Sequence, residues 1–333
     1  MRKLFLLLSV LFVVSCSKDE ITFSDDLLLN GSWSSYDMPL NWKYRDGSML
    51  VNFKNKLFLM GGWTYDEPYN GGKIVNEIWV SNDGENWEQQ PNAPWPGRHG
   101  AGSVVHNDKL FIVGGDHYND CWSTKDGLNW VLENDNLPFE GRYTPNLVSI
   151  NGNLVLYAGV KLDPITKSSI GFKDIWISKN GIEWKKLSDA PWEPRGLIHN
   201  SVLFNGKIYL IGGGHKYDDT LQEYSDVWTS KNGIDWEIET TNFGIKPRTH
   251  FSVLNAFDAI WISDGSIGNQ SGLSNDLFFS RDGKEFKQVL VPSDMPKRHA
   301  SSFINFKNKL IILGGPPSGF PRNKVSVYTL NVN

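Results

Sequence analysis

Five stretches of the chain repeat one twelve-residue pattern that decides the fold: NEIWVSNDGENW (76–87), NDCWSTKDGLNW (119–130), KDIWISKNGIEW (173–184), SDVWTSKNGIDW (225–236) and NDLFFSRDGKEF (275–286). Each has an aromatic residue, then Asp-Gly or Asn-Gly, then a second aromatic residue eight positions after the first. Asp-Gly and Asn-Gly pairs accept the positive φ angles of tight hairpin turns. We therefore expect each stretch to be a β-hairpin with both aromatic side chains on one side.

A second pattern precedes these hairpins, an apolar strand that starts at a tight turn and ends at glycine. Its copies are NKLFLMGG (55–62), NDKLFIVGG (107–115), NGNLVLYAG (151–159), NGKIYLIGG (205–213), NKLIILGG (308–315) and the divergent AFDAIWISDG (256–265). One unit is thus four strands in about 50 residues, which is the spacing of some propeller repeats. A single unit cannot bury both of its faces, so the copies must stack.

The number of units follows from the spacing of arginine residues. Arg45, Arg98, Arg142, Arg195, Arg248 and Arg298 each precede the first strand of a unit, at intervals of 44 to 53 residues. Only 35 residues follow Arg298, and NGSW (30–33) looks like a fourth strand without a third. We therefore expect six units, with the N-terminal strand completing the unit that VSVYTLNVN (325–333) forms.

The glycine pair, the later tryptophan and a Pro-Arg before the first strand, as in Pro194-Arg195 and Pro247-Arg248, resemble kelch repeats over residues 30–333. The resemblance implies an all-β fold, a six-bladed kelch-type β-propeller with four strands per blade and the last blade closed by the N-terminal strand. Propellers host binding modules and enzymes alike, so the fold alone names no function.

The start of the chain predicts export. Arg2 and Lys3 precede a short apolar stretch, residues 4–14, which suits a signal peptide over 1–15, whereas a membrane span needs about 20 residues. VVSC (13–16) resembles a bacterial lipobox, which implies lipidation of Cys16 and membrane attachment through the lipid anchor alone. A plain secretory signal is the alternative.

The polar, acidic run SKDEITFSDD (17–26) predicts a flexible tether. The expected organisation is a signal peptide at 1–15, the lipidated cysteine and tether at 16–28, and the propeller at 29–333. The protein is then an outer-membrane lipoprotein, periplasmic or exposed at the cell surface.

Composition excludes several classes of function. The net charge of −4 becomes −6 once residues 1–15 are removed, which argues against a nucleic-acid partner. Cys121 stands where other units have Ile78, Ile175 and Val227, so we expect a core residue and no disulfide. The chain has no Walker A, G-x-G-x-x-G, HExxH or G-x-S-x-G motif and no metal-ligand spacing, so we expect no cofactor and no metal. We also expect a monomer.

Topology places the arginines on one face of the molecule. The connections between second and third strands, which we expect to be long irregular loops, lie on this arginine face, and the turns within the hairpins lie on the opposite turn face. Six of the seven histidines fall on the arginine face, with Trp63 and Asp116 nearby, and His106 falls in a turn. The candidate ligand-binding residues are Arg45, Arg98, His99, His117, Arg142, Tyr143, Arg195, His199, Arg248, His250, Arg298 and His299. In the alternative interpretation the arginines brace neighbouring blades, and any single histidine is structural.

Arginine and histidine favour planar anions, and tyrosine and tryptophan suit sugar rings. The predicted partner is therefore an anionic carbohydrate or a protein ligand. The alternative is an enzyme acting on acidic sugars, either a polysaccharide lyase or a mutarotase like the six-bladed kelch N-acetylneuraminate epimerases, with His215, Tyr217 and Asp218 as candidate acid–base residues. Galactose oxidase, another kelch relative, uses copper with a cysteine-crosslinked tyrosine; Cys121 lies on a predicted strand, which argues against that chemistry.

Overall fold

The computed structural model describes residues 23–331 except 39–41, 44, 67–70, 164, 166–167, 200–201, 218–219, 269–271 and 316–325. Antiparallel β-sheet makes up almost all of the regular structure in these described residues, so the all-β prediction is confirmed. No helix within them has the length and hydropathy needed to cross a bilayer.

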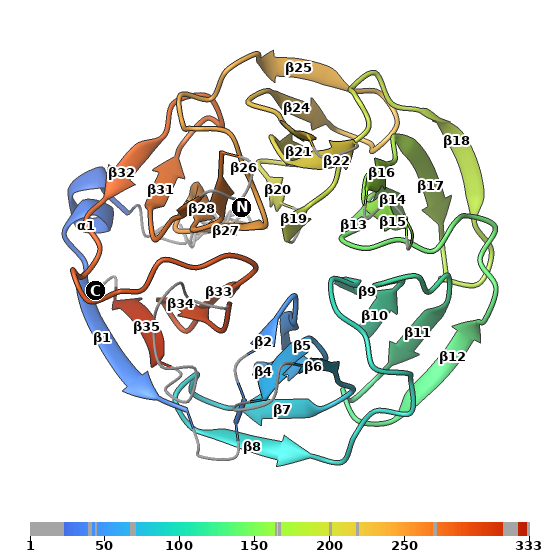
Figure 1. The fold of residues 1–333 in the computed structure, drawn as a ribbon, viewed down its shortest axis with the longest axis horizontal. Helices are drawn as coiled ribbons and strands as arrows, with labels where there is room; N and C mark the ends of the chain where they lie inside the picture. Colours follow the sequence, from blue (N-terminus) through green and yellow to red (C-terminus); the bar gives the residue numbers. More distant parts are fainter. Residues whose placement is uncertain are drawn as a thin grey trace, which may run out of the picture.

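Six sheets of four main strands follow one another around a common centre (Figure 1). In chain order they are sheet 1, with β3 (Met49–Phe53), β4 (Lys56–Met60), β7 (Ile78–Ser81) and β8 (Trp87–Gln90); sheet 2, with β9 (Gly102–His106), β10 (Lys109–Val113), β11 (Cys121–Thr124) and β12 (Trp130–Asn134); sheet 3, with β13 (Asn146–Ile150), β14 (Asn153–Tyr157), β17 (Asp174–Ser178) and β18 (Lys185–Asp189); sheet 4, with β20 (Val202–Phe204), β21 (Lys207–Ile211), β24 (Val227–Ser230) and β25 (Glu237–Thr240); sheet 5, with β27 (Phe251–Ala256), β28 (Ala259–Ser263), β31 (Leu277–Ser280) and β32 (Lys287–Val289); and sheet 6, with β33 (Ser302–Phe306), β34 (Lys309–Leu313), β35 (Ser326–Asn331) and β1 (Ser32–Asp37). A short strand, β19 (Ile198–His199), also pairs with β27, in parallel.

The last sheet joins the two ends of the described chain. Strand β1 pairs antiparallel with β35, from Ser32 opposite Asn331 to Asp37 opposite Ser326. The prediction that the N-terminal strand completes the C-terminal unit is therefore confirmed. This pairing brings together segments almost 300 residues apart in the sequence.

The two kinds of turn on the turn face differ. Turns between first and second strands have two residues at positive φ, such as Asn107 at 47° and Asp108 at 58°, as two-residue hairpins require. The predicted hairpins between third and fourth strands also form. Each connecting loop is longer than the tight turn that was expected, and we call these loops the wider loops. In sheet 1 the glycine alone has positive φ, and Ser81 Oγ and the Asp83 carboxylate accept backbone N–H groups of residues 83–86 to hold the loop closed.

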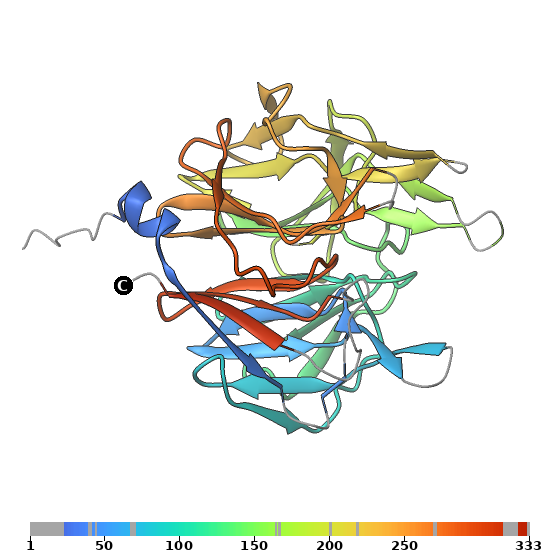
Figure 2. The same cartoon turned by 60° about the vertical axis from the view of Figure 1, so that its left-hand side comes forward.

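The connections between second and third strands are more regular than the sequence suggests. Within the described residues, four units carry an extra β-hairpin here, where irregular loops were expected, and Figure 2 shows hairpins projecting from one end of the molecule. The hairpins are β5 (Trp63–Asp66) with β6 (Gly71–Ile74), β15 (Val160–Leu162) with β16 (Ser169–Gly171), β22 (Gly214–Tyr217) with β23 (Thr220–Glu223), and β29 (Ser266–Ile267) with β30 (Gly272–Leu273). Short strands β2 (Arg45–Asp46) and β26 (Arg248–Thr249) pair with the first and last of them.

Neighbouring sheets pack through apolar side chains and glycine. Cys121 is fully buried beside Phe111 and Leu154, so its predicted core position is confirmed. The glycines of the wider loops meet the next sheet closely: a Cβ on Gly127 would lie 2.2 Å from the Phe58 ring of sheet 1. Close packing of this kind fixes one sheet against the next.

The N-terminal segment corrects part of the predicted tether. Residues 25–28 were expected in the flexible tether, but helix α1 (Asp25–Leu29) begins at an N-cap provided by Ser24. Leu28 is fully buried against sheets 5 and 6, and the Phe23 ring lies 4.7 Å from the Phe257 ring. The residues before Phe23, with the predicted signal peptide and Cys16, lie outside the described residues.

Six backbone positions, one before each first strand, form a cycle of hydrogen bonds that we call the belt. Each lies two residues after an arginine, and each has a positive φ between 50° and 60°. Its donor–acceptor pairs are Gly47 N to Ala300 O, Ala300 N to His250 O, His250 N to Leu197 O, Leu197 N to Thr144 Oγ1, Thr144 N to Gly100 O and Gly100 N to Gly47 O. Four of the six residues are not glycine, so surrounding contacts must hold them in this unfavourable conformation.

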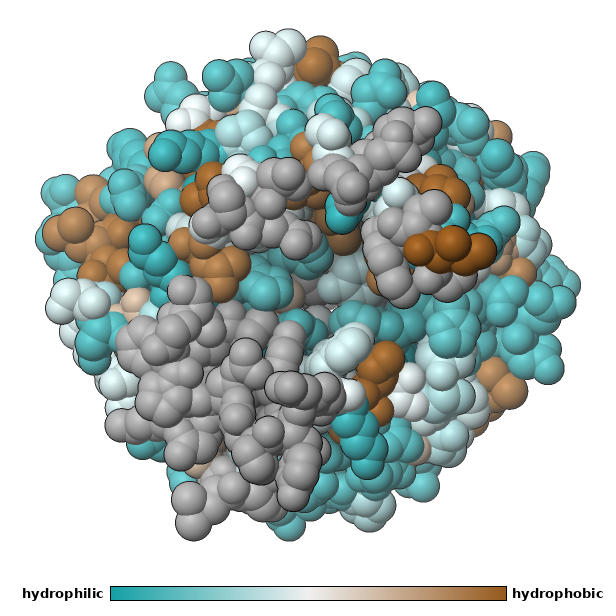
Figure 3. Space-filling view, in the orientation of Figure 1, coloured by the Kyte–Doolittle hydropathy of each residue, from teal (hydrophilic) through white to brown (hydrophobic). Residues whose placement is uncertain are grey.

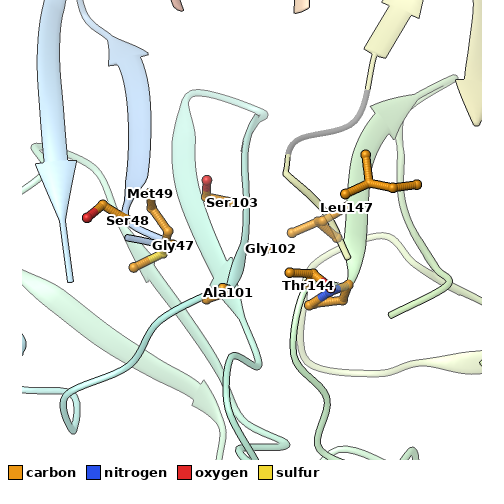
Figure 4. A pocket seen from close by; sticks show the side chains of 11 residues that line it. Gly47, Ser48, Met49, Ala101, Gly102, Ser103, Thr144 and Leu147 are labelled. Carbon is orange, nitrogen blue, oxygen red and sulfur yellow. The ribbon is translucent and has the colours of Figure 1, made fainter. Parts of the chain in front are cut away.

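Cavities also lie between the first strands of the sheets. A small one of about 20 Å³ is enclosed by residues at the starts of β3, β9 and β13, as Figure 4 shows. A larger one, of about 420 Å³, is lined by residues of the first strands of all six sheets.

Candidate functional site

The six predicted arginines are internal to the fold. Each side chain is at most 1% exposed. Each donates through Nη1 to the carbonyl that ends the second strand of its unit and through Nε to the carbonyl two residues before it. The Nη1 acceptors are Gly61, Gly114, Ala158, Gly212, Asp264 and Gly314, and the Nε acceptors are Lys43, Pro96, Glu140, Glu193, Lys246 and Pro296.

Five of these arginines also bind a carboxylate at the start of the third strand of the same unit, either its first residue or the residue before it. The pairs are Arg45–Glu77, Arg98–Asp120, Arg142–Asp174, Arg195–Asp226 and Arg248–Asp276. Burial raises the pKa of the Asp174 carboxyl, but the bonded guanidinium of Arg142 outweighs it and holds that pKa below its usual range. An aromatic ring often covers the guanidinium as well, as Phe172 does for Arg142 at 4.0 Å.

This geometry leaves the arginines no role in contacting a ligand from solvent. Each guanidinium donates to backbone carbonyls inside the protein, and the side chains are covered. They brace the fold, as the alternative interpretation held. They do so differently, however, because the five arginines paired with a carboxylate join the first, second and third strands of one sheet rather than two neighbouring sheets.

Beside the buried arginines lies a group of ring side chains that we call the histidine–aromatic cluster: Trp63, His99, Tyr143, His250 and His299. Ring centroids are 5.7 Å apart for Trp63 and His99, and 4.7 Å for His99 and Tyr143. They are 6.4 Å apart for Tyr143 and His250, and 5.6 Å for His250 and His299. The cluster thus joins side chains from five of the six units.

The cluster has no member from the fourth unit, because that unit has a glycine at the equivalent position. His99, Tyr143 and His299 directly follow an arginine, and the equivalent residue of the fourth unit is Gly196. A Cβ on Gly196 would lie 2.8 Å from the Cα of Gly159, so no larger residue fits without a shift. Tyr143 therefore faces His250 of the fifth unit.

Asp116 fixes His99 from two sides. Its Oδ2 accepts the backbone N–H of His99 at 2.9 Å, and its Oδ1 lies 2.5 Å from the ring Nδ1. The carboxylate of Asp116 therefore positions both the backbone and the ring of His99. Trp63 is 36% exposed and the His99 side chain 11%, so solvent reaches this end of the cluster.

The electrostatic character of the cluster differs from that of an arginine ring. Burial lowers the pKa of His299, although the carboxylate of Asp46 opposes the shift. This imidazole is therefore neutral at neutral pH and can both donate and accept hydrogen bonds. The cluster offers ring faces and, at His299, a neutral imidazole, which suit a hydroxyl-bearing ligand.

The other predicted site residues lie apart from the cluster or outside the described residues. His117 is exposed and its ring lies 4.6 Å from that of Tyr118. His215 lies beside Tyr224, 6.2 Å between rings, and burial lowers its pKa. His199 and Tyr217 belong to β19 and β22, but their side chains, and all of Asp218, lie outside the described residues.

Sequence reasoning missed one feature that supports this region. Before four of the arginines, the aromatic residue three positions upstream packs on aromatic residues near the third and fourth strands of the same unit, as Trp192 does with Trp228 and Trp236 at 6.2 and 4.4 Å. The signal was present in the repeated APW and LPF segments before the arginines.

No group of three or more histidine, cysteine, aspartate or glutamate side chains is placed to hold a metal ion in the described part of the chain. A comparison of the chain with protein-family models and with curated proteins finds no match.

Proposed function

We propose that the six sheets form a closed six-bladed β-propeller of the kelch kind. The support is the belt, whose six hydrogen bonds pass once through every unit and return to the first. The pairing of β1 with β35 supports it too, because it gives the sixth unit its fourth strand.

The anchored location belongs to the same proposal. The charged start, the short apolar stretch and VVSC (13–16) support cleavage before Cys16 and its lipidation. The protein then acts outside the cytoplasm, at the outer membrane. Metabolic labelling with a fatty acid and its loss in Cys16→Ala tests this step.

The function that the geometry supports best is carbohydrate binding by the histidine–aromatic cluster. The observation that carries it is the row of ring contacts that joins Trp63, Tyr143 and three histidines from five units and that solvent reaches at its Trp63 end. Aromatic faces stack on the apolar faces of sugar rings, and imidazoles exchange hydrogen bonds with hydroxyl groups. Because the arginines are occupied internally, the ligand needs no carboxylate for recognition.

A glycan array followed by titration calorimetry tests this function. We expect Trp63→Ala and His99→Ala to weaken binding of the selected oligosaccharide about 3- to 10-fold each, the range expected for one aromatic contact. His117→Ala is the matched control, since His117 lies on the same face outside the cluster. Equal losses in His99→Ala and His117→Ala would contradict the site, and binding of a protein in place of glycans would contradict the ligand class.

A second candidate function rests on the His99–Asp116 pair. A histidine oriented by a carboxylate beside a tyrosine is suited to acid–base catalysis, such as anomer interconversion or β-elimination on acidic sugars. Exchange between the anomers of acidic sugars, followed by proton NMR, and ultraviolet absorbance of unsaturated products test both reactions. Tight binding with no turnover would favour the binding module.

A further inference from the structure

The N-terminal segment is fixed at the turn face of sheet 5. The ring of Phe23 packs on Phe257, which lies in the turn between β27 and β28. Asp25 is paired with Arg281, 3.0 Å from its Nε, and with Lys287. Arg281 follows β31 at the start of the wider loop and also donates to the carbonyl of Phe257. The chain therefore enters the fold at the turn face.

The extra hairpins and the cluster lie at the other end of the molecule. Figure 2 shows α1 at the left and the hairpin of β22 and β23 projecting at the right. Trp63 begins β5 in another of these hairpins, so the cluster belongs to the same end. The chain thus enters the fold on the turn face, and the proposed binding site lies on the opposite face.

The length of chain before Phe23 limits how the protein can stand on a membrane. Seven residue steps separate Cys16 from Phe23, and they span at most about 25 Å when fully extended. A five-residue first strand spans about 17 Å, and the four-residue strands of a hairpin add about 13 Å. A chain attached at the turn face therefore cannot pass the hairpins to reach a membrane beyond them.

We infer that the lipid-anchored protein lies with its turn face and the α1 edge against the membrane, so that the histidine–aromatic cluster faces away from it. The inference rests on the proposed lipidation of Cys16. The partner of the turn face is then a lipid bilayer, and the ligand of the cluster approaches from the side away from the bilayer.

The α1 edge has an apolar surface that suits this contact. At the left rim of the hairpin-bearing face that Figure 3 shows, hydrophobic residues gather beside α1 and β32. Leu290, just after β32, is 85% exposed, and its carbonyl accepts the indole N–H of Trp33 at 3.0 Å. Leu27 and Leu29 of α1 are only partly buried. Exposed leucines at the place where an anchored chain emerges can rest at a lipid interface.

Two cysteine variants of the full chain, purified with their lipid and reconstituted into phosphatidylcholine vesicles, test the orientation. Glu285→Cys places a thiol in the wider loop next to α1, and Ile165→Cys places one between β15 and β16. Both positions are exposed, whereas Cys121 is fully buried and stays unlabelled. Each thiol is coupled to an environment-sensitive fluorophore, and the vesicles carry a nitroxide-labelled lipid as quencher.

We expect quenching at position 285 and none at position 165. Stronger quenching at 165, or none at either position in protein that floats with the vesicles, would overturn the orientation. Protein that stays in solution, without an acyl mass on Cys16, would instead contradict the proposed anchor and the orientation with it. Circular dichroism of both variants checks that they are folded.

Discussion

Replacing Arg142 by methionine tests whether this arginine stabilises the fold or binds a ligand. The guanidinium donates to Glu140 O at 3.2 Å, Ala158 O at 3.1 Å and both oxygens of Asp174 at 2.6 and 2.9 Å. Arg142→Met would leave the covered Asp174 carboxylate without its cation and Ala158 O without this donor. Breaking one side of a buried ion pair costs about 3–5 kcal/mol, so we expect a loss of unfolding free energy of that size.

Urea unfolding followed by tryptophan fluorescence measures this loss. Lys161→Met is the matched control, because it removes the cation of the exposed Lys161–Glu140 pair, whose loss costs at most about 1 kcal/mol. The double variant Arg142→Met/Asp174→Met should recover part of the lost stability, since a buried pair can be replaced by apolar side chains. An unchanged urea midpoint together with lost sugar binding in Arg142→Met would refute the bracing role.

Three further predictions concern buried groups. Burial raises the pKa of the Asp264 carboxyl to about 7, so between about pH 4 and pH 7 the folded protein keeps a proton that the unfolded chain loses. The free energy of unfolding therefore falls as the pH rises through this range. Asp264→Asn should therefore gain stability relative to the parent between pH 5 and pH 8 in urea unfolding, and an equal difference at both pH values would contradict this. Burial also raises the pKa of the Cys121 thiol, so a thiol reagent should label it only after unfolding, and rapid labelling of the folded protein would argue against its core position. Gly127→Ala should lower the free energy of unfolding by about 1–3 kcal/mol more than Gly152→Ala does. Both glycines have a positive φ, but only a Cβ on Gly127 would meet a ring, that of Phe58. Equal losses measured by thermal unfolding would count against this packing.

Much of the fold was predictable because its signals are local. Hairpin turns, apolar strands and the spacing of the arginines depend on residues close in sequence, and NGSW (30–33) revealed the strand that pairs with β35. The wider loops were missed because side-chain acceptors such as Asp83, rather than the backbone of an Asp-Gly turn, hold them closed. Helix α1 was missed because its stability comes from Leu28 packing on distant sheets.

The candidate site was predictable only in part. The sequence pointed to His99, His250 and His299, which share one cluster, but the orientation of the arginines depends on carboxylates 22 to 32 residues away, such as Asp120 for Arg98 and Asp174 for Arg142. The acidic residue repeated at the start of the third strand in five of the units was a signal for this pairing. Contacts within the cluster cross between units, so no local pattern could distinguish His99 and His250 from the outlying His117.

The most direct measurement is an NMR titration of protein carrying ¹³C-labelled histidine with the oligosaccharide selected on the array. The account predicts that the ring signals of His99, His250 and His299 shift with the ligand. The signals of His106, which contacts Ser149 Oγ and Lys179 O on the turn face, should stay unchanged. Saturable binding that moves His106 and leaves the three cluster histidines unchanged would contradict it.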